Sequence, residues 1–315
     1  MANEFRTSPA HSAEYFGDTR EYWWNSDYLE LLGKRLSLNR VDKVLDVGCG
    51  VGHWGEMLAS ILPSTARVEG VDRDPYWVEK ATKRVAQRGL AERFHFHQGL
   101  AESLPFADNS FDLVTCQTVL IHTAEPGTVL DEMIRVVRPG GLILLAEPNN
   151  AANALIFDSI TLTDPVDKVI ALARFQLICE RGKSSLGEGN NSIGDILPGL
   201  LAQRGLVDIQ VYLNDKASAV VPPYHTPEQR AVLDEMADLE TRDFWIWSRD
   251  DTHRYFIAGG GQEKEFDELW QSTKSDAARM REAVETGAYA RAGACIGYLV
   301  AGRRPFELRD RHAHP

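Results

Sequence analysis

The sequence predicts an α/β protein: a doubly wound, mostly parallel sheet of about seven strands, with a helical cap inserted before the last strand. Two patterns support this prediction. Short apolar runs alternate with amphipathic helical segments over residues 44–147, as they do in right-handed βαβ crossovers. The runs at 111–118 and 142–147 are almost continuously apolar, which is typical of strands buried on both faces.

The first half of the chain supplies most of this sheet. Residues 14–38 are expected to be helical, and the first strand then leads into a glycine-rich turn. Proline and glycine end the next helices, since one pattern stops before Pro63 and another is closed by Gly89. The expected strands are 44–47, 68–72, 94–98, 111–118 and 142–147, and the helices between them are 52–62, 75–88 and 126–137.

After residue 150 the pattern loosens and becomes mainly helical. The long helical stretch near the end begins with Thr226 as a cap before Pro227 at the first helical position. The expected elements are helices at 151–180, 194–204 and 226–290, a loop at 182–192, and strands at 207–213 and 294–301.

The composition is that of an ordinary globular protein. Of the 315 residues, 43% are apolar and 25% are charged, and the net charge of −12 disfavours nucleic acid, whose binding depends on lysine and arginine. No apolar stretch approaches the roughly 18 residues of a membrane span, and the N-terminus has no apolar signal segment. The four cysteines lie far apart without a C-x-x-C pair, so neither a metal site nor a disulfide framework is expected. We therefore expect a cytoplasmic protein that has no membrane partner.

The most informative segment is the turn after the first strand, where glycines stand at positions 48, 50 and 52. Glycine lacks a β-carbon, so a ligand can approach the backbone of such a turn closely. A dinucleotide site requires the spacing G-x-G-x-x-G, but this chain has His53 where the third glycine would stand. Asp72 ends the second strand, 20 residues after Gly52, where a carboxylate can accept hydrogen bonds from both hydroxyls of a ribose. The glycine spacing therefore argues against a dinucleotide cofactor, whereas Asp72 remains a candidate for binding a ribose.

The pattern D-x-G-x-G-x-G at 46–52 resembles motif I of the class I S-adenosylmethionine-dependent methyltransferases. Besides Asp72, three further segments resemble that family in the same order: its adenine loop, its fourth strand and the turn before its fifth strand. These segments are QGLAESLPF at 98–106, SFDLV at 110–114 and RPGG at 138–141. The resemblance implies a Rossmann-like fold and S-adenosylmethionine as the cofactor.

The resemblance also implies a division of the chain. The family commonly builds acceptor-specific caps before the last strand. Aromatic and polar residues between Phe244 and Phe256 suit an acceptor pocket, but they equally suit a cap core or a dimer surface. The implied division is a helical lid at 1–40, the S-adenosylmethionine-binding core at 41–150, the rest of the core with substrate-side helices and a strand at 151–225, the cap at 226–292, the final strand at 293–305 and a polar tail at 306–315.

Cofactor roles follow from the resemblance for residues at the carboxyl ends of the strands. Asp72 would hold the ribose and Asp46 the ammonium group of the methionine moiety, with stabilisation of the turn as the alternative role of Asp46. Many relatives have an acid at position 100 for the adenine amino group, whereas this chain has Leu100, so packing, backbone contacts or Glu102 would hold the adenine. Glu102 could equally cap the short turn before Pro105. The other implied contacts are Gly48, Cys49 and Gly50 with the methionine moiety and ribose, Arg73, Ala101 and Glu102 with the adenine, and the Gln117 carbonyl with the ammonium group.

Aromatic residues before the core suggest a lid over the cofactor. Relatives often fold a helix there, which would exclude water and offer an aromatic face to the sulfonium. Packing of that helix on the core is the alternative role of these aromatics. Arg20 could reach the methionine carboxylate or remain a solvated surface charge. The aromatic residues concerned are Tyr15, Phe16, Tyr22, Trp23 and Trp24.

No motif identifies the methyl acceptor, because the sulfonium supplies the chemical drive and the protein mainly positions a nucleophile. His122 follows the fourth strand and is the candidate general base, with packing at the start of a helix as its alternative role. Glu147, Asn149 and Asn150 end the fifth strand and could also face the acceptor, with turn formation as the favoured role of the two asparagines.

These observations predict the transfer of a methyl group to an oxygen or nitrogen of a small organic molecule or modified peptide. Methylation of RNA or protein is one alternative. The tetrapeptide Asn/Asp-Pro-Pro-Tyr/Phe, typical of base-methylating enzymes, is absent after the fourth strand, which continues as QTVL at 117–120. A non-catalytic module that binds the cofactor and regulates a partner is the other alternative. The sequence leaves the oligomeric state open, and a homodimer is one of the options.

Overall fold

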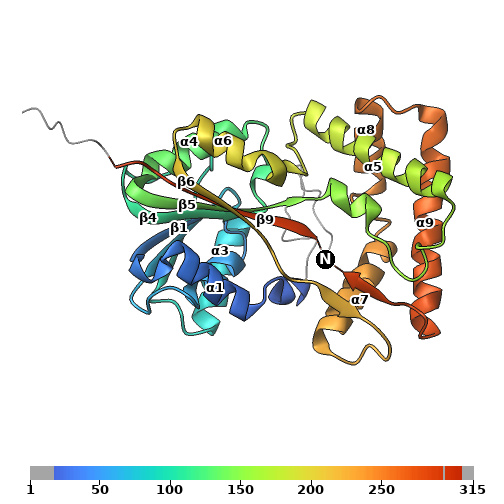
Figure 1. Ribbon diagram of the computed structural model, residues 1–315, viewed down its shortest axis with the longest axis horizontal. Coiled ribbons are helices and arrows are strands. Elements are labelled where there is room, and N and C mark those ends of the chain that lie inside the picture. Colours follow the sequence, from blue (N-terminus) through green and yellow to red (C-terminus); the bar gives the residue numbers. More distant parts are fainter. Residues whose placement is uncertain (1–17, 294, 307–315) are drawn as a thin grey trace, which may run out of the picture.

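A seven-stranded sheet organises the core, with strand order β3-β2-β1-β4-β5-β9-β6 (Figure 1). The computed structural model describes residues 18–293 and 295–306. Strands β1 to β5 pair in parallel, and β9 runs antiparallel to both β5 and β6. The predicted doubly wound, mostly parallel sheet is therefore confirmed. The strands are β1 (Lys43–Val47), β2 (Arg67–Asp72), β3 (Phe94–Gln98), β4 (Phe111–Gln117), β5 (Val137–Asn149), β6 (Val207–Leu213) and β9 (Ile296–Arg303).

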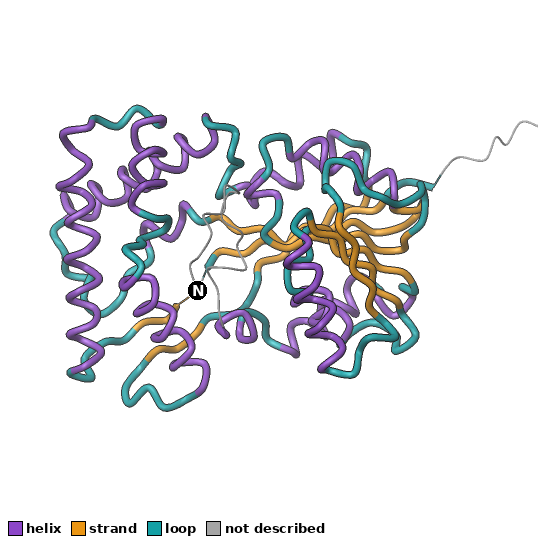
Figure 2. The backbone as a smooth tube through the Cα atoms, turned by 180° about the vertical axis from the view of Figure 1, so that it is seen from behind, coloured by secondary structure: helices purple, strands orange, loops and turns teal. Residues whose placement is uncertain are grey.

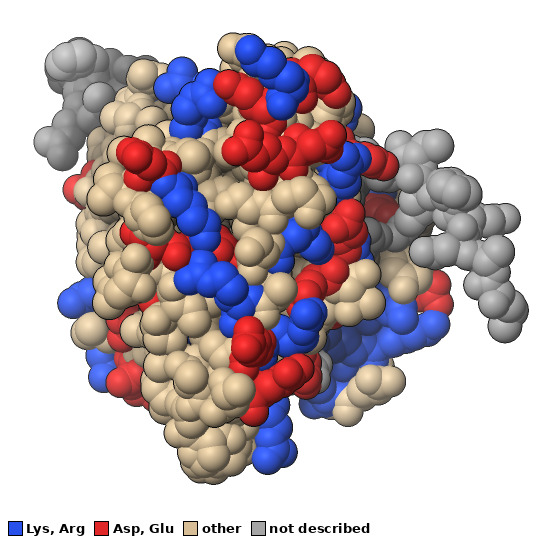
Figure 3. Space-filling view, turned by 90° about the vertical axis from the view of Figure 1, so that its right-hand side faces the viewer, with Lys and Arg blue, Asp and Glu red and all other residues tan. Residues whose placement is uncertain are grey.

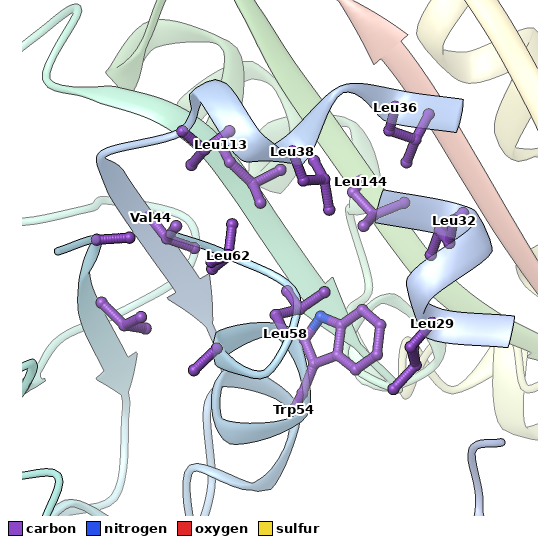
Figure 4. Packing of buried hydrophobic residues seen from close by; sticks show 14 of the residues in the cluster. Leu29, Leu32, Leu36, Leu38, Val44, Trp54, Leu58, Leu62, Leu113 and Leu144 are labelled. Carbon is purple, nitrogen blue, oxygen red and sulfur yellow. The ribbon is translucent and has the colours of Figure 1, made fainter. Parts of the chain in front are cut away.

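Helices cover both faces of the sheet, and each face has its own apolar core. On one face, Trp54 and Leu58 pack with Leu32 against Val44 and Leu144 of the strands (Figure 4). This face carries α1 (Ser26–Leu36), α2 (His53–Ala59) and α3 (Pro75–Gln87), and the other carries α4 (Pro126–Val136) and α6 (Leu197–Gln203).

A second lobe, the cap, stands beside the carboxyl ends of the strands (Figures 1 and 2). Helix α5 precedes the segment expected to form the cap, yet it packs on α8 and α9 and shares their aromatic core through Phe175. Tyr255 and Phe256, expected either in a pocket or in a cap core, are buried in that core with Trp270. The cap elements are α5 (Val166–Ser185), α7 (Pro227–Thr241), α8 (Arg249–Ala258), α9 (Glu263–Glu285) and the ribbon of β7 (Ser218–Val220) with β8 (Arg291–Gly293).

Several boundaries differ from those expected. Strand β5 begins at Val137 and takes in the RPGG segment, which was expected to be a turn before the strand. Helix α5 begins at Val166 and not at residue 151, because Pro165 lacks a backbone N–H and its ring would clash inside a longer helix. The helix runs to Ser185, inside the expected loop. The short elements outside the sheet and cap are η2 (Asp18–Tyr22), η3 (Leu38–Arg40), η4 (Leu120–His122), η5 (Ala151–Leu155) and η6 (Ile193–Ile196).

The N-terminal aromatics divide into two groups. Tyr15 and Phe16 lie outside the described residues. The ring of Trp24 packs on Trp54 of α2, with 4.9 Å between the ring centroids, and stacks on Tyr28 of α1. Packing on the core, the alternative role considered for these residues, therefore accounts for Trp24.

In the described part of the chain, no helix is long and apolar enough to cross a membrane.

Candidate cofactor site

A pocket lies at the carboxyl ends of β1 and β4, where doubly wound folds bind ligands. Its walls come from η2, the glycine turn, the start of α2 and the end of β4. Six residues predicted to bind the cofactor meet in this pocket although they lie up to 97 positions apart in the chain. The lining residues are Arg20, Asp46, Gly48, Cys49, Gly50, His53, Trp54 and Gln117.

The turn after β1 has a conformation that favours glycine. Gly48, Gly50 and Gly52 have φ angles of +65°, +51° and +78°, in the left-handed region that other residues rarely adopt. A β-carbon on Gly48 would also stand 2.5 Å from the Cγ2 atom of Val119, which follows β4. The sequence pattern at 48–52 therefore reflects both the backbone conformation and a close approach of the β4 end.

Asp72 braces this turn from the end of β2. Its side chain is buried, and its Oδ2 and Oδ1 atoms accept hydrogen bonds from the backbone N–H groups of Gly50 (2.9 Å) and Asp74 (3.0 Å). The backbone N–H of Cys49 donates to the carbonyl of Val71 (3.0 Å), which ties the turn to the same strand. Because a carboxylate offers about four acceptor positions, Asp72 can still accept from a ligand.

The remaining predicted cofactor residues lie outside the pocket lining. Arg73 and Glu102 are exposed, and Ala101 and Tyr22 are half-buried. Leu100, in the predicted adenine loop, is 55% exposed and offers an apolar surface where many relatives have an acid. The structure leaves the roles of these residues as predictions.

Asp46 is a buried carboxyl at the floor of the pocket. Its Oδ2 atom accepts a hydrogen bond from the backbone N–H of Gly55 (3.1 Å). Burial raises the pKa of Asp46 to about 8, the Gly55 hydrogen bond opposes this rise, and the Asp72 carboxylate adds to it. A cationic ligand group beside Asp46 would restore its charge, because an opposite charge favours the ionised form.

This raised pKa predicts a pH dependence of stability. Between pH 4 and 8 the folded protein holds a proton on Asp46 that the unfolded chain releases, so the free energy of unfolding falls as pH rises through this window. In the Asp46→Asn variant this contribution disappears, and the fall should be shallower by an amount on the order of 1–3 kcal/mol. Chemical denaturation of the ligand-free protein at pH 5, 6.5 and 8 measures both slopes. Equal slopes in the two proteins would contradict the assignment.

Arg20 enters the pocket from η2. Burial lowers the pKa of its guanidinium to about 10, while the Glu235 carboxylate of α7 opposes that shift and the Arg84 guanidinium adds to it. The guanidinium also lies 5.1 Å from the centre of the Trp23 ring. A cation held in this way can bind an anionic ligand group such as a carboxylate.

His53 and Trp54 are pocket residues that sequence reasoning missed. His53 is 2% exposed, and neither of its ring nitrogens has a hydrogen-bond partner among the described residues. Burial lowers the pKa of His53 to about 4, so the ring is neutral near pH 7. The Nε1 atom of Trp54 donates to the Thr115 hydroxyl (2.8 Å), which fixes the indole under the pocket. The only sequence signal for His53 was its position where a dinucleotide site would have glycine.

Glu147 does not face an acceptor, contrary to one expectation from the sequence. Its carboxylate is buried and accepts hydrogen bonds from the backbone N–H groups of Val119 (2.8 Å) and Leu120 (2.9 Å). Burial raises the pKa of Glu147 to about 7, and these hydrogen bonds oppose the rise. Glu147 thus holds the segment that follows β4. That segment carries the candidate base His122, which is exposed and lies outside the pocket lining.

The two asparagines after Glu147 contact elements on the cap side. Asn149 Nδ2 donates to the Asp195 carboxylate (2.6 Å), and Asn150 Nδ2 donates to the carbonyl of Asn191 (2.9 Å). The carbonyl of Asn150 in turn accepts from the Gln176 side chain of α5 (2.8 Å). Both side chains therefore hold segments that lie 46 and 41 positions further along the chain. Within the described residues, no group of three or more histidine, cysteine, aspartate or glutamate side chains could hold a metal ion.

Fold and site together define a class of protein. A parallel sheet with an antiparallel strand between β5 and β6, a left-handed glycine turn after β1 and an acid at the end of β2 are features typical of class I S-adenosylmethionine-dependent methyltransferases. The comparison with protein families agrees, since residues 38–183 match the model described as "Methyltransferase domain". Residues 38–183 therefore carry a methyltransferase domain, and the domain and fold are of the kind found in class I methyltransferases, whose cofactor is S-adenosylmethionine.

Individual relatives match the same region. The chain is 40% identical over 118 residues to Methyltransferase GfsG of Streptomyces halstedii, covering 38% of this chain and 42% of the relative. It is 35% identical over 128 residues to a demethylmenaquinone methyltransferase of Geobacillus, covering 41% of this chain and 53% of the relative. The chain thus spans about half the length of these curated relatives.

A solved structure described as that of a methyltransferase from Galdieria sulphuraria resembles the whole fold. The TM-score is 0.50 at 17% sequence identity, and the alignment covers 90% of this chain and 85% of the other. At this level of identity the likeness concerns the fold alone.

Proposed function

We propose that this protein transfers the methyl group of S-adenosylmethionine to a small organic molecule. The observation that carries the proposal is the convergence of Arg20, Asp46, Gly48, Gly50 and Gln117 on one pocket beside the glycine turn. When bound, the cofactor supplies a methyl group on a positively charged sulfur. The protein's own task is to hold that group in line with a nucleophile and to exclude water.

The residues present fit this cofactor. Asp46 and the carbonyl of Gln117 would hold its ammonium group, and Arg20 would bind its carboxylate. Asp72 would accept hydrogen bonds from the ribose hydroxyls, with Arg73, Ala101 and Glu102 around the adenine. The two unpartnered nitrogens of the buried His53 supply one further polar group in the same pocket.

We expect the acceptor atom to be oxygen or nitrogen, with His122 as the base wherever the acceptor must lose a proton. Carbon is the second candidate, because the relatives include enzymes named demethylmenaquinone methyltransferase and sterol 24-C-methyltransferase. The names of these two relatives also favour a small molecule over a modified peptide.

The charge distribution agrees with a small-molecule acceptor rather than a nucleic acid. On the face of the cap in Figure 3, most basic side chains lie next to acidic ones. The ion pairs of the cap include Arg249 with Asp267 (2.7 Å) and Arg174 with Glu265 (3.5 Å). Cations neutralised in this way contribute little to phosphate binding, which depends on the release of counterions.

Two measurements test the proposed function. Titration calorimetry with S-adenosylhomocysteine should show one binding site per chain. Incubation with S-adenosylmethionine labelled in its methyl group should then place the label in a pool of small phenols, amines and quinones, and not in pools of peptide or RNA. Absence of binding would favour a non-catalytic module, and label only in RNA or protein would overturn the proposed substrate class.

A further inference from the structure

The segment after β4, residues 118–122, is held by three different parts of the protein, and we call it the β4 loop. From the core, Glu147 accepts hydrogen bonds from its backbone N–H groups. Toward the pocket, Val119 packs against Gly48 so closely that no β-carbon would fit there. From the cap, the Nζ atom of Lys183 donates a hydrogen bond to the carbonyl of Ile121 (2.6 Å). The loop therefore connects the cap to the cofactor pocket.

Lys183 is an unusual residue for a helix interface. It belongs to α5 and is only 3% exposed. Burial lowers the pKa of its amine to about 8, while the carboxylates of Glu180, Glu188 and Glu147 oppose this shift. Burying an amine costs free energy that a methionine or leucine at the same position would not cost. Packing of α5 alone therefore does not explain this lysine, whereas its hydrogen bond to Ile121 does.

A second contact between the same elements supports this interpretation. Gly189, in the segment after α5, has a φ angle of +94°. A β-carbon on Gly189 would lie 2.3 Å from the carbonyl oxygen of Ile121 and 2.9 Å from the backbone carbon of His122. The backbone after α5 thus lies directly on the β4 loop, at the carbonyl that Lys183 binds.

We propose that Lys183 is a positioning residue, through which the cap holds the β4 loop in the conformation that binds the cofactor. In that conformation Val119 supports the glycine turn, and His122 stands at the end of the loop. This inference rests on the proposed function, because it assumes that the pocket beside Gly48 binds S-adenosylmethionine. A lysine that served only the cap's own stability would leave the pocket unaffected.

Titration calorimetry with S-adenosylhomocysteine tests the inference. The Lys183→Met variant keeps the length of the side chain and removes the donor, so we expect about tenfold weaker binding, the effect of one buried hydrogen bond. Amide hydrogen exchange should become faster at residues 119–122. Lys168→Met is the matched control, since Lys168 lies on the same helix but pairs with Asp164 and Asp276. We expect this control to bind within about twofold of the wild type.

A second variant keeps the test decisive if Lys183→Met does not fold. Gly189→Ala places a methyl group against the Ile121 carbonyl, so binding should weaken by about tenfold here as well. Wild-type affinity in either folded variant, or equal weakening in Lys168→Met, would overturn the inference. If the wild type itself does not bind S-adenosylhomocysteine, the proposed function fails before this question arises.

Discussion

Replacing Asp72 with alanine is expected to weaken the binding of S-adenosylhomocysteine by at least about 100-fold. The carboxylate braces the glycine turn through the N–H of Gly50 and the start of α3 through the N–H of Asp74. Its loss leaves two backbone donors without this partner, one of them buried, and removes the proposed acceptor for the ribose hydroxyls. Each hydrogen bond to a charged group contributes about 1.5–3 kcal/mol. The two proposed hydrogen bonds from the ribose hydroxyls therefore account for the expected loss of affinity. Titration calorimetry measures the affinity directly.

Asp112→Ala is the matched control for this prediction. Asp112 lies at the start of β4, at the opposite end of the sheet, and also accepts two backbone hydrogen bonds, from Asp42 (2.8 Å) and Lys43 (2.9 Å). Its loss should lower the melting temperature by several degrees and leave the affinity for S-adenosylhomocysteine within about twofold. A folded Asp72→Ala protein that binds as tightly as the Asp112→Ala protein would contradict the assigned role of Asp72.

The glycine turn could be predicted from the sequence because its requirements are local. Left-handed φ angles exclude most side chains, so glycines at 48, 50 and 52 mark the turn wherever the rest of the chain lies. Alternating apolar runs and helical segments then place the turn at the carboxyl edge of a parallel sheet. The resemblance to the methyltransferase family then implied cofactor contacts for Asp46 and Gln117, and both residues line the pocket beside the turn.

The contacts that the sequence did not reveal are those between distant elements. Glu147 lies near the carboxyl end of β5, but its carboxylate accepts hydrogen bonds from backbone N–H groups of the β4 loop, 26 to 28 positions away. His53 attracts attention only once its ring is seen buried without partners. Lys183 lies in the last turn of α5, beyond residue 180 where the helix was expected to end. No local sequence pattern connects it to Ile121. Burial and partners of this kind depend on tertiary packing, which a single sequence does not specify.

The Gly48→Ala variant should lose both stability and cofactor affinity. A non-glycine residue at a φ angle of +65° costs about 1–2 kcal/mol. The new methyl group would also stand 2.5 Å from Val119 Cγ2, and overpacking of this kind costs about 1–3 kcal/mol more. Because relief of that collision moves either the glycine turn or the β4 loop, binding of S-adenosylhomocysteine should weaken by about ten- to a hundredfold.

Gly89→Ala separates the collision from the backbone strain. Gly89 follows α3 with a φ angle of +71°, close to that of Gly48, but nothing lies within 4 Å of an added β-carbon. This variant should lose about 1–2 kcal/mol of unfolding free energy in chemical denaturation and keep its affinity for S-adenosylhomocysteine. If Gly48→Ala behaved like Gly89→Ala in both measurements, the contact between Val119 and the glycine turn would have no part in shaping the pocket. If only Gly48→Ala bound S-adenosylhomocysteine more weakly, cofactor affinity would depend on how closely the β4 loop approaches the glycine turn.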